Sequence, residues 1–188
     1  MRVIAGTHKG RRLLAGRGDA LRPTSGRVKE ALFSILGDRV TGARMLDLFA
    51  GTGAIGIEAL SRGAAQVTFV ESGSDSLRLL KENLHRCGAE ADARIERLSA
   101  VSYLRRGTDA PYDLVFADPP YKTDSARDVL PDIERSVMIS PQTLVILEHP
   151  TRQDVPSRVG RLTQTRQYRY GDTMLTLYSV DDTPKPQP

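Results

Sequence analysis

The chain has 188 residues, 39% hydrophobic and 27% charged, which is the size and composition of one soluble globular domain. No apolar run approaches the roughly 18 residues of a membrane span, and the first residues lack the apolar stretch of a signal peptide. The one cysteine, Cys87, excludes an internal disulfide, and with only three scattered histidines it excludes a Cys/His zinc cluster. We therefore expect a cytoplasmic protein without a bound metal.

The net charge of +4 is distributed unevenly along the chain. Residues 1–45 carry ten basic residues (Lys/Arg) and three acidic ones (Asp/Glu). Residues 46–150 carry eleven basic and sixteen acidic residues, and residues 151–180 carry five basic and two acidic residues. Two basic segments therefore flank an acidic middle. Because phosphates bind basic surfaces through counterion release, this pattern favours a polyanionic partner such as a nucleic acid. An ordinary solvated surface is the alternative.

The first 23 residues are predicted to form a basic N-terminal arm. Short apolar runs around Gly6 and Gly10 favour a small hairpin or an extended segment, and residues 15–23, rich in Gly and Arg, favour a loop. A helix is expected next, because Thr24 or Ser25 can cap its start and apolar residues then recur at helical spacing up to Gly37. These apolar residues are Val28, Ala31, Leu32, Ile35 and Leu36.

From residue 44 onward, short apolar runs alternate with amphipathic helical patterns. Buried strands are predicted at residues 45–49, 67–70, 114–117 and 144–147, with a weaker one at 93–98. Helices are predicted around residues 77–87, which precede Gly88, and around residues 129–133. This order predicts an α/β chain with a Rossmann-like, doubly wound and mostly parallel sheet.

The last part of the chain has a different pattern. Residues 161–170 and 173–180 flank Gly171-Asp172 and predict a C-terminal antiparallel hairpin. Residues 181–188 contain three prolines and no core-forming residues, so we expect a disordered tail. The predicted organisation is thus an arm at 1–23, one α/β domain at 24–180 and a tail at 181–188.

Residues 47–56, Asp-Leu-Phe-Ala-Gly-Thr-Gly-Ala-Ile-Gly, combine a predicted strand end, a Gly-x-Gly-x-x-Gly turn and a helix start. Glycines let the backbone turn tightly and approach a ligand closely. Glu71 follows Gly51 by twenty residues, at the end of the next predicted strand, where an acidic side chain can hold both hydroxyls of a ribose. The pattern predicts a nucleoside-type cofactor site, with a merely structural tight turn as the alternative.

Asp47 distinguishes between two cofactors, NAD and S-adenosylmethionine. A carboxylate directed into the turn would repel a pyrophosphate, whereas it suits the positively charged amino group of S-adenosylmethionine. The alternative is that Asp47 only caps nearby backbone amides.

A second motif, Asp118-Pro119-Pro120-Tyr121, follows the predicted strand at 114–117, at a carboxyl end of the sheet where such folds bind ligands. Consecutive prolines stiffen the loop, so the Asp118 carboxylate and the Pro119 carbonyl present two fixed hydrogen-bond acceptors beside the ring of Tyr121. Two acceptors and an aromatic face complement the exocyclic amine of a flipped nucleobase, whose nitrogen attacks more readily when both N–H groups are bonded. A proline-rich turn that caps a strand is the alternative.

Together the two motifs resemble amino methyltransferases that use S-adenosylmethionine. Residues 3–13, Val-Ile-Ala-Gly-Thr-His-Lys-Gly-Arg-Arg-Leu, and residues 22–36, which begin Arg-Pro-Thr-Ser-Gly-Arg, are similar to the opening signatures of the RsmD family. The resemblance covers residues 1 to about 180. It implies methylation of the N2 amine of one guanine, position 966, of 16S ribosomal RNA in a partly assembled small ribosomal subunit.

The resemblance also gives the predicted site residues their roles. The catalytic residues would be Asp118, Pro119 and Tyr121. S-adenosylmethionine, and the product S-adenosylhomocysteine, would contact Asp47, Phe49, Gly51, Gly53, Glu71, Ser72, Ser99 and Ala100. The RNA would contact Lys9, Arg11, Arg12, Arg22 and Arg27. We expect a monomer that binds no metal and no membrane.

The chain departs from the family pattern at two positions. Gly26 stands where family members often carry Asp, which leaves the cap of the first predicted helix open. Ser99 stands where related methyltransferases often place an acid for the adenine amino group, so a Ser99 hydroxyl or a backbone group is expected to make that contact.

Several polar residues are expected to be structural. Glu58 is interpreted as a surface or capping residue, Cys87 as a core residue, and His8 and His149 as structural or RNA-facing groups. Two alternative functions stay open. One is an adenine-N6 or cytosine-N4 DNA methyltransferase, and the lack of a recognisable target-recognition domain argues against it. The other is a noncatalytic RNA-binding ribosome assembly factor.

Overall fold

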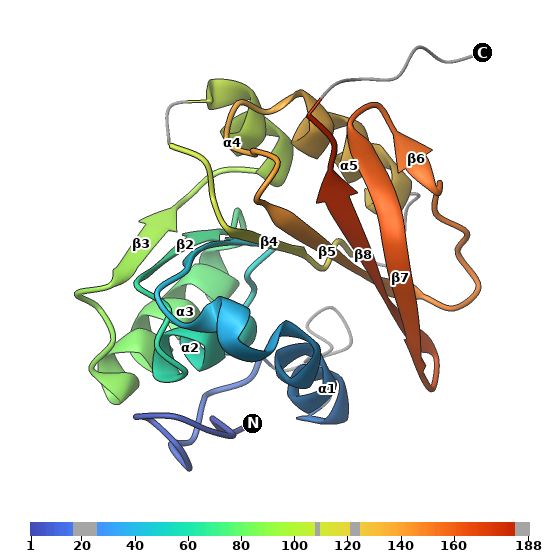
Figure 1. The fold of residues 1–188 in the computed structure, drawn as a ribbon. Coiled ribbons are helices and arrows are strands. Elements are labelled where there is room, and N and C mark those ends of the chain that lie inside the picture. The colour runs from blue at the N-terminus through green and yellow to red at the C-terminus, as the bar shows by residue number, and fades with distance from the viewer. Residues whose placement is uncertain (17–25, 108–109, 121–124, 183–188) are drawn as a thin grey trace. The chain divides into compact units, whose positions relative to one another are not determined.

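The computed structural model describes residues 1–16, 26–107, 110–120 and 125–182 (Figure 1). Most of the predicted loop at 15–23 and of the predicted tail lies outside the described residues, as do Arg22 and Tyr121. The chain divides into two compact units, Met1–Ser99 and Ala100–Pro188. The domain boundaries predicted after residues 23 and 180 stay predictions.

The first unit contains three parallel strands in the order β3-β2-β1. Its elements are α1 (Gly26–Leu36), the 3₁₀ helix η2 (Gly37–Val40), β1 (Arg44–Leu48), α2 (Ala54–Ser61), β2 (Gln66–Val70), α3 (Ser74–Cys87) and β3 (Ala93–Glu96). Helices α2 and α3 connect the strands and lie on the same side of them (Figure 1). Every residue of β1 and β2 after the first is buried, as expected for parallel strands.

The helices of the first unit follow the predicted pattern. In α1, Val28, Leu32 and Leu36 are buried, and in α3 the apolar stripe that ends at Cys87 is buried. Helix α3 ends at Gly88, which adopts a left-handed conformation with φ 65°. The predicted strands at 45–49, 67–70 and 93–98 are confirmed with small changes at their ends.

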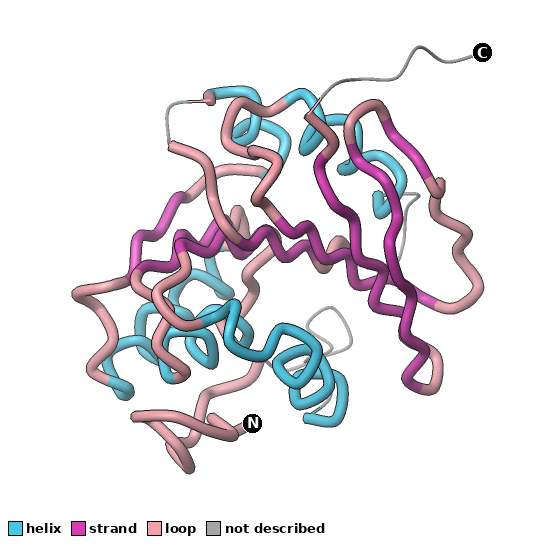
Figure 2. The backbone as a smooth tube through the Cα atoms, in the orientation of Figure 1, coloured by secondary structure: helices cyan, strands magenta, loops and turns pink. Residues whose placement is uncertain are grey.

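The second unit contains a mixed sheet in the order β4-β5-β8-β7-β6, in which only β4 and β5 are parallel neighbours. Its elements are α4 (Ala100–Arg106), β4 (Leu114–Ala117), α5 (Ser125–Arg135), β5 (Leu144–Pro150), β6 (Arg158–Val159), β7 (Leu162–Tyr170) and β8 (Thr173–Val180). Figure 2 shows β7 and β8 as one long antiparallel hairpin, as predicted. Helix α4 and the two-residue strand β6 were not predicted from the sequence.

The N-terminal arm forms a small irregular hairpin that packs against the rest of the first unit. Arg2 and Arg12 form an antiparallel bridge, and the Val3 amide donates to the Arg11 carbonyl at 3.0 Å. Val3 and Leu13 are 2% and 4% exposed, so both belong to the core. The arm is therefore fixed by apolar burial as well as by hydrogen bonds.

Within the described ranges, no helix is long and apolar enough to cross a membrane.

Candidate active site

The glycine turn after β1 has a backbone that most side chains would not allow. Gly51 and Gly53 have φ values of 55° and 81°, in the left-handed region that glycine tolerates best. A Cβ atom on Gly53 would lie 2.3 Å from the Cδ1 atom of Leu80. Phe49 also has a positive φ, 61°, without being glycine. Such strained residues cost about 1–3 kcal/mol and are concentrated at ligand sites.

Glu71, at the end of β2, is fixed directly against this turn. Its Oε2 atom accepts a hydrogen bond from the Gly51 amide at 2.8 Å, and its Oε1 atom accepts one from the Gly73 amide at 2.6 Å. A carboxylate can accept about four hydrogen bonds. Gly51 and Glu71, twenty residues apart in the sequence, are therefore in direct contact in the fold. The Glu71 carboxylate can still accept further hydrogen bonds, such as those from a ribose diol.

Asp47 lies near the end of β1, where its side chain is buried and bonded to the start of α2. The residue is 2% exposed, and its Oδ2 atom accepts a hydrogen bond from the Gly56 amide at 3.0 Å. This bond fastens the first turn of α2 to the end of β1. Asp47 therefore has the amide-capping role that the sequence left open, and its contact with a cofactor amino group stays a prediction.

The turn and Glu71 fit an adenosyl cofactor of the S-adenosylmethionine type. Bare glycine backbone gives close access, and one carboxylate stands beside it for the ribose. Ser72 follows Glu71 and is exposed, and Ser99 is exposed where the first unit ends. Ala100 is buried at the start of α4 in the second unit, and its contact with a cofactor stays a prediction.

Asn83 links the glycine turn to the N-terminal arm. The side chain is 0% exposed, and its Nδ2 atom donates to the Thr52 carbonyl at 2.9 Å and to the Leu14 carbonyl at 3.0 Å. Its Oδ1 atom accepts from the Leu14 amide at 2.7 Å. One buried amide on α3 therefore supports both the arm and the predicted cofactor turn.

In the second unit, Asp118 follows β4 directly, at the position predicted for the catalytic carboxylate. The residue is half-buried, Pro119 is buried and Pro120 is exposed. Burial of the carboxyl group raises the pKa of Asp118 to about 7. Although part of the residue reaches solvent, the loss of water around the carboxyl group dominates, so Asp118 changes its charge near neutral pH. Tyr121 lies outside the described residues.

Glu148 is a neighbour of Asp118 that the sequence analysis missed. Ala117 pairs with Leu147 in the register of β4 and β5, so the residues that follow them, Asp118 and Glu148, are next to each other. Glu148 is 3% exposed. The sequence carried a signal, since Glu148 directly follows the apolar run 144–147, as Asp118 follows the run 114–117.

The basic residues predicted to bind RNA are exposed where the structure describes them. Lys9, Arg11 and Arg12 lie on the arm hairpin, and Arg27 lies in the first turn of α1. Arg11 also donates to the Arg86 carbonyl near the end of α3. These side chains offer positive charge at the surface of the first unit.

The expectation that Glu58 is a surface or capping residue is wrong. Glu58 is 0% exposed and accepts hydrogen bonds from the Ile4 amide at 2.8 Å and the Ala5 amide at 3.0 Å. It also forms ion pairs with Lys29 at 2.8 Å and Arg62 at 2.9 Å. Glu58 therefore fastens the arm and α1 to α2. Its partners are far away in the sequence, which is why helical pattern alone did not reveal the role.

The other titratable residues considered, His149 and Cys87, are buried in the core. His149 is 2% exposed, with its Nε2 atom 2.8 Å from the Thr176 Oγ1 atom, and burial lowers its pKa. Cys87 is buried as predicted, which raises its pKa. Among the residues that the structure describes, no group of three or more His, Cys, Asp or Glu side chains is arranged to hold a metal ion.

Comparisons with known proteins cover nearly the whole chain. The family model described as "Conserved hypothetical protein 95" matches residues 1–179. The Bacillus subtilis (strain 168) protein "Putative rRNA methyltransferase YlbH" is 37% identical over 180 residues, 95% of this chain and 98% of the relative. The Escherichia coli (strain K12) "Ribosomal RNA small subunit methyltransferase D" is 33% identical over 179 residues, 95% of this chain and 89% of the relative.

A solved structure gives the same result for the fold. The "Putative methyltransferase yhhF from Escherichia coli" is 32% identical and matches with a TM-score of 0.84 over 96% of this chain and 98% of that chain. The predicted fold class, a Rossmann-like class I methyltransferase fold with antiparallel C-terminal strands, is thereby confirmed. The chain belongs to the RsmD family.

Proposed function

We propose that this protein transfers a methyl group from S-adenosylmethionine to the exocyclic N2 amine of a guanine in 16S ribosomal RNA, at position 966. The observation that carries the proposal is the Asp118-Pro119-Pro120 segment at the end of β4, in a chain that belongs to the RsmD family. The names of the relatives supply the substrate class, small-subunit ribosomal RNA. The proposed setting is an assembling small subunit in the cytoplasm, with the protein acting as a monomer.

The cofactor is proposed to bind at the glycine turn of the first unit. Glu71 would accept hydrogen bonds from the two ribose hydroxyls while it keeps its bonds to the Gly51 and Gly73 amides. Asp47 and the Phe49 backbone would face the amino-acid end, and Ser72, Ser99 and Ala100 the adenosine end. When bound, S-adenosylmethionine supplies an electrophilic methyl group on a sulfonium sulfur.

Asp118 and Pro119 are proposed to activate the attacking amine. The two N–H groups of the guanine amine would donate to the Asp118 carboxylate and the Pro119 carbonyl, which frees the nitrogen lone pair for the methyl carbon. As the carbon–nitrogen bond forms and the carbon–sulfur bond breaks, positive charge develops on nitrogen beside the carboxylate. The nitrogen then loses one proton, and S-adenosylhomocysteine is the second product. Tyr121 is proposed to stack on the base.

The test is methyl transfer from radiolabelled S-adenosylmethionine to naked DNA, free 16S ribosomal RNA and small subunits that lack the modification, followed by mapping of the labelled base. Label on N2 of one guanine in the RNA or the subunit is the expected result. Label on DNA adenine or cytosine would instead identify a DNA methyltransferase. Binding to the subunit without label on any substrate would identify a noncatalytic assembly factor.

A further inference from the structure

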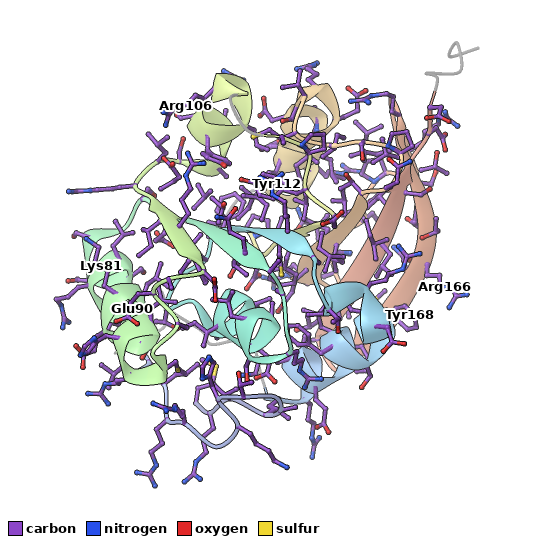
Figure 3. The ribbon with its side chains drawn as sticks, turned by 60° about the vertical axis from the view of Figure 1, so that its left-hand side comes forward. Lys81, Glu90, Arg106, Tyr112, Arg166 and Tyr168 are labelled. Atoms are coloured by element: carbon purple, nitrogen blue, oxygen red, sulfur yellow. The ribbon has the colours of Figure 1, made fainter. Side chains whose placement is uncertain are left out.

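Strand β7 carries a row of one exposed arginine and two half-buried tyrosines on a single face. Arg166, Tyr168 and Tyr170 are spaced by two residues, so their side chains point to the same side of the hairpin. The Arg166 Nη1 atom donates to the Tyr168 hydroxyl at 3.2 Å. Arg166 is exposed and both tyrosines are half-buried. Figure 3 shows Arg166 extending outward from the strand beside Tyr168.

The register of the second unit places this row on the same sheet face as Asp118. Tyr168 pairs with Leu175 on β8, and Leu175 pairs with Glu148 on β5. Glu148 is next to Asp118, because Leu147 pairs with Ala117. Directly paired residues share a face, and neighbouring strands are about 4.8 Å apart. Tyr168 is therefore about 15 Å from Asp118, a span of about four stacked nucleotides at 3.4 Å each.

The charge of the row is available to a ligand. None of the ion pairs among the described residues involves Arg166, whereas Arg158 and Arg161 pair with Asp181 and Glu134. Strand β7 itself contains no acidic residue. A cation beside two aromatic rings suits a phosphate backbone and its stacked bases.

The surface fits a nucleic acid better than an apolar protein partner. Within the described ranges, Val137 is the one large hydrophobic side chain that is strongly exposed, and it does not lie on β7. Protein interfaces also use tyrosine and arginine, but their fully buried core is mostly apolar, and β7 supplies no such core. The combination on β7 is instead that of single-stranded nucleic acid sites, where aromatic rings stack on bases and basic groups bind phosphates.

We propose that Arg166, Tyr168 and Tyr170 form a second RNA-binding face, which holds unpaired nucleotides that flank the target base. This inference rests on the proposed function and adds a contact surface that is separate from the N-terminal arm. The target base would be held at Asp118 and flanking nucleotides of the same RNA at the tyrosines, without contact to Leu175 and Glu148, which are buried on the two strands between them.

The test uses the full-length protein and an RNA hairpin with the sequence around the target guanine of 16S ribosomal RNA. Binding is measured by fluorescence anisotropy over a series of salt concentrations. Arg166→Ala should reduce the slope of log affinity against log salt by about 0.7–0.9, and Tyr168→Ala should weaken binding about fivefold to a hundredfold. Tyr168→Phe keeps the ring and should bind nearly as well as the wild type.

The matched control is Arg78→Ala, which removes one exposed positive charge from α3 in the other unit. An Arg78 variant with the same loss of salt slope as Arg166→Ala would overturn the inference, because net charge alone would then explain the effect. Unchanged RNA affinity in both Arg166→Ala and Tyr168→Ala would also overturn it. Calorimetric titration with S-adenosylhomocysteine should give wild-type affinity for every variant, which shows that the fold is intact.

The two proposals fail in different ways. Absence of guanine methylation by the wild-type protein would refute the proposed function. The binding series alone decides the role of β7, because it does not depend on methyl transfer.

Discussion

The buried cluster around Glu58 predicts a large loss of stability from a single truncation. Glu58→Ala removes the partner of the Lys29 ammonium, which is 0% exposed and would keep only the Arg2 carbonyl at 2.8 Å. Leaving one charge of a buried pair uncompensated costs about 3–5 kcal/mol. The Ile4 and Ala5 amides also lose their acceptor, at about 1 kcal/mol each. The sum is about 5–7 kcal/mol.

Urea denaturation of the wild type and the variant measures this loss as a difference in the free energy of unfolding. The matched control is Glu82→Ala, which breaks a surface ion pair with Arg86 in which both side chains are 45% exposed. Exposed pairs of this kind contribute about 0–1 kcal/mol. Because a domain has about 5–15 kcal/mol of stability, the Glu58 variant should be marginally folded and the Glu82 variant almost unchanged.

The pH dependence gives an independent check. Desolvation raises the pKa of Glu58, but the hydrogen bond and charge of Lys29 together with the Ile4 amide outweigh it, so the pKa lies below its usual value. A carboxyl group with a lowered folded-state pKa stabilises the protein above its unfolded-state pKa, and this contribution is lost as pH falls through the folded-state pKa. The free energy of unfolding should therefore fall less on acidification in Glu58→Ala than in the wild type. A Glu58 variant no less stable than the Glu82 control would refute the reasoning.

Four further predictions concern the candidate active site and the arm. Asp118→Asn should lower the rate of single-turnover methyl transfer about 10²–10³-fold. In the wild type, this rate should rise with pH through about 7, as the Asp118 carboxyl group ionises. The same variant should have a higher Tm than the wild type at pH 8, because a raised carboxyl pKa destabilises the fold as pH rises towards that value. Glu71→Ala should weaken S-adenosylmethionine and S-adenosylhomocysteine equally in calorimetry, and a loss for only one of them would contradict a shared ribose contact. Gly6→Ala should lower the unfolding midpoint far more than Gly10→Ala. The two glycines have similar φ values, 82° and 84°, but only at Gly6 would the new Cβ atom lie 1.6 Å from the Ser61 carbonyl oxygen.

Local patterns predicted the parts of the fold and the site that depend on nearby residues. The strand at 114–117 and the hairpin around Gly171 were predicted almost to the residue, because apolar runs and turn glycines mark them directly. The contact between Glu71 and the glycine turn was also predictable, since parallel strands bring their carboxyl ends to one edge.

Features that depend on distant partners were not predictable in the same way. Glu58 lies on a helix of eight residues, and its amide partners Ile4 and Ala5 are more than fifty residues away. No periodicity signals such a contact. Helix α4 was missed because its seven residues, Ala100–Arg106, include only four apolar ones and end in two arginines.

The double hydrogen bonding of Asn83 has a thermodynamic consequence for the two ligands of this enzyme. One side chain holds both Leu14 in the arm and Thr52 in the glycine turn, so a displacement of either segment changes the support of the other. If ligand binding displaces either segment, the binding free energies at the two sites would be coupled, and any such coupling is reciprocal. If RNA binds the arm and the cofactor binds the turn as proposed, the factor by which RNA changes cofactor affinity equals the factor by which the cofactor changes RNA affinity. The exchange of product for fresh cofactor would then also shift the affinity for RNA.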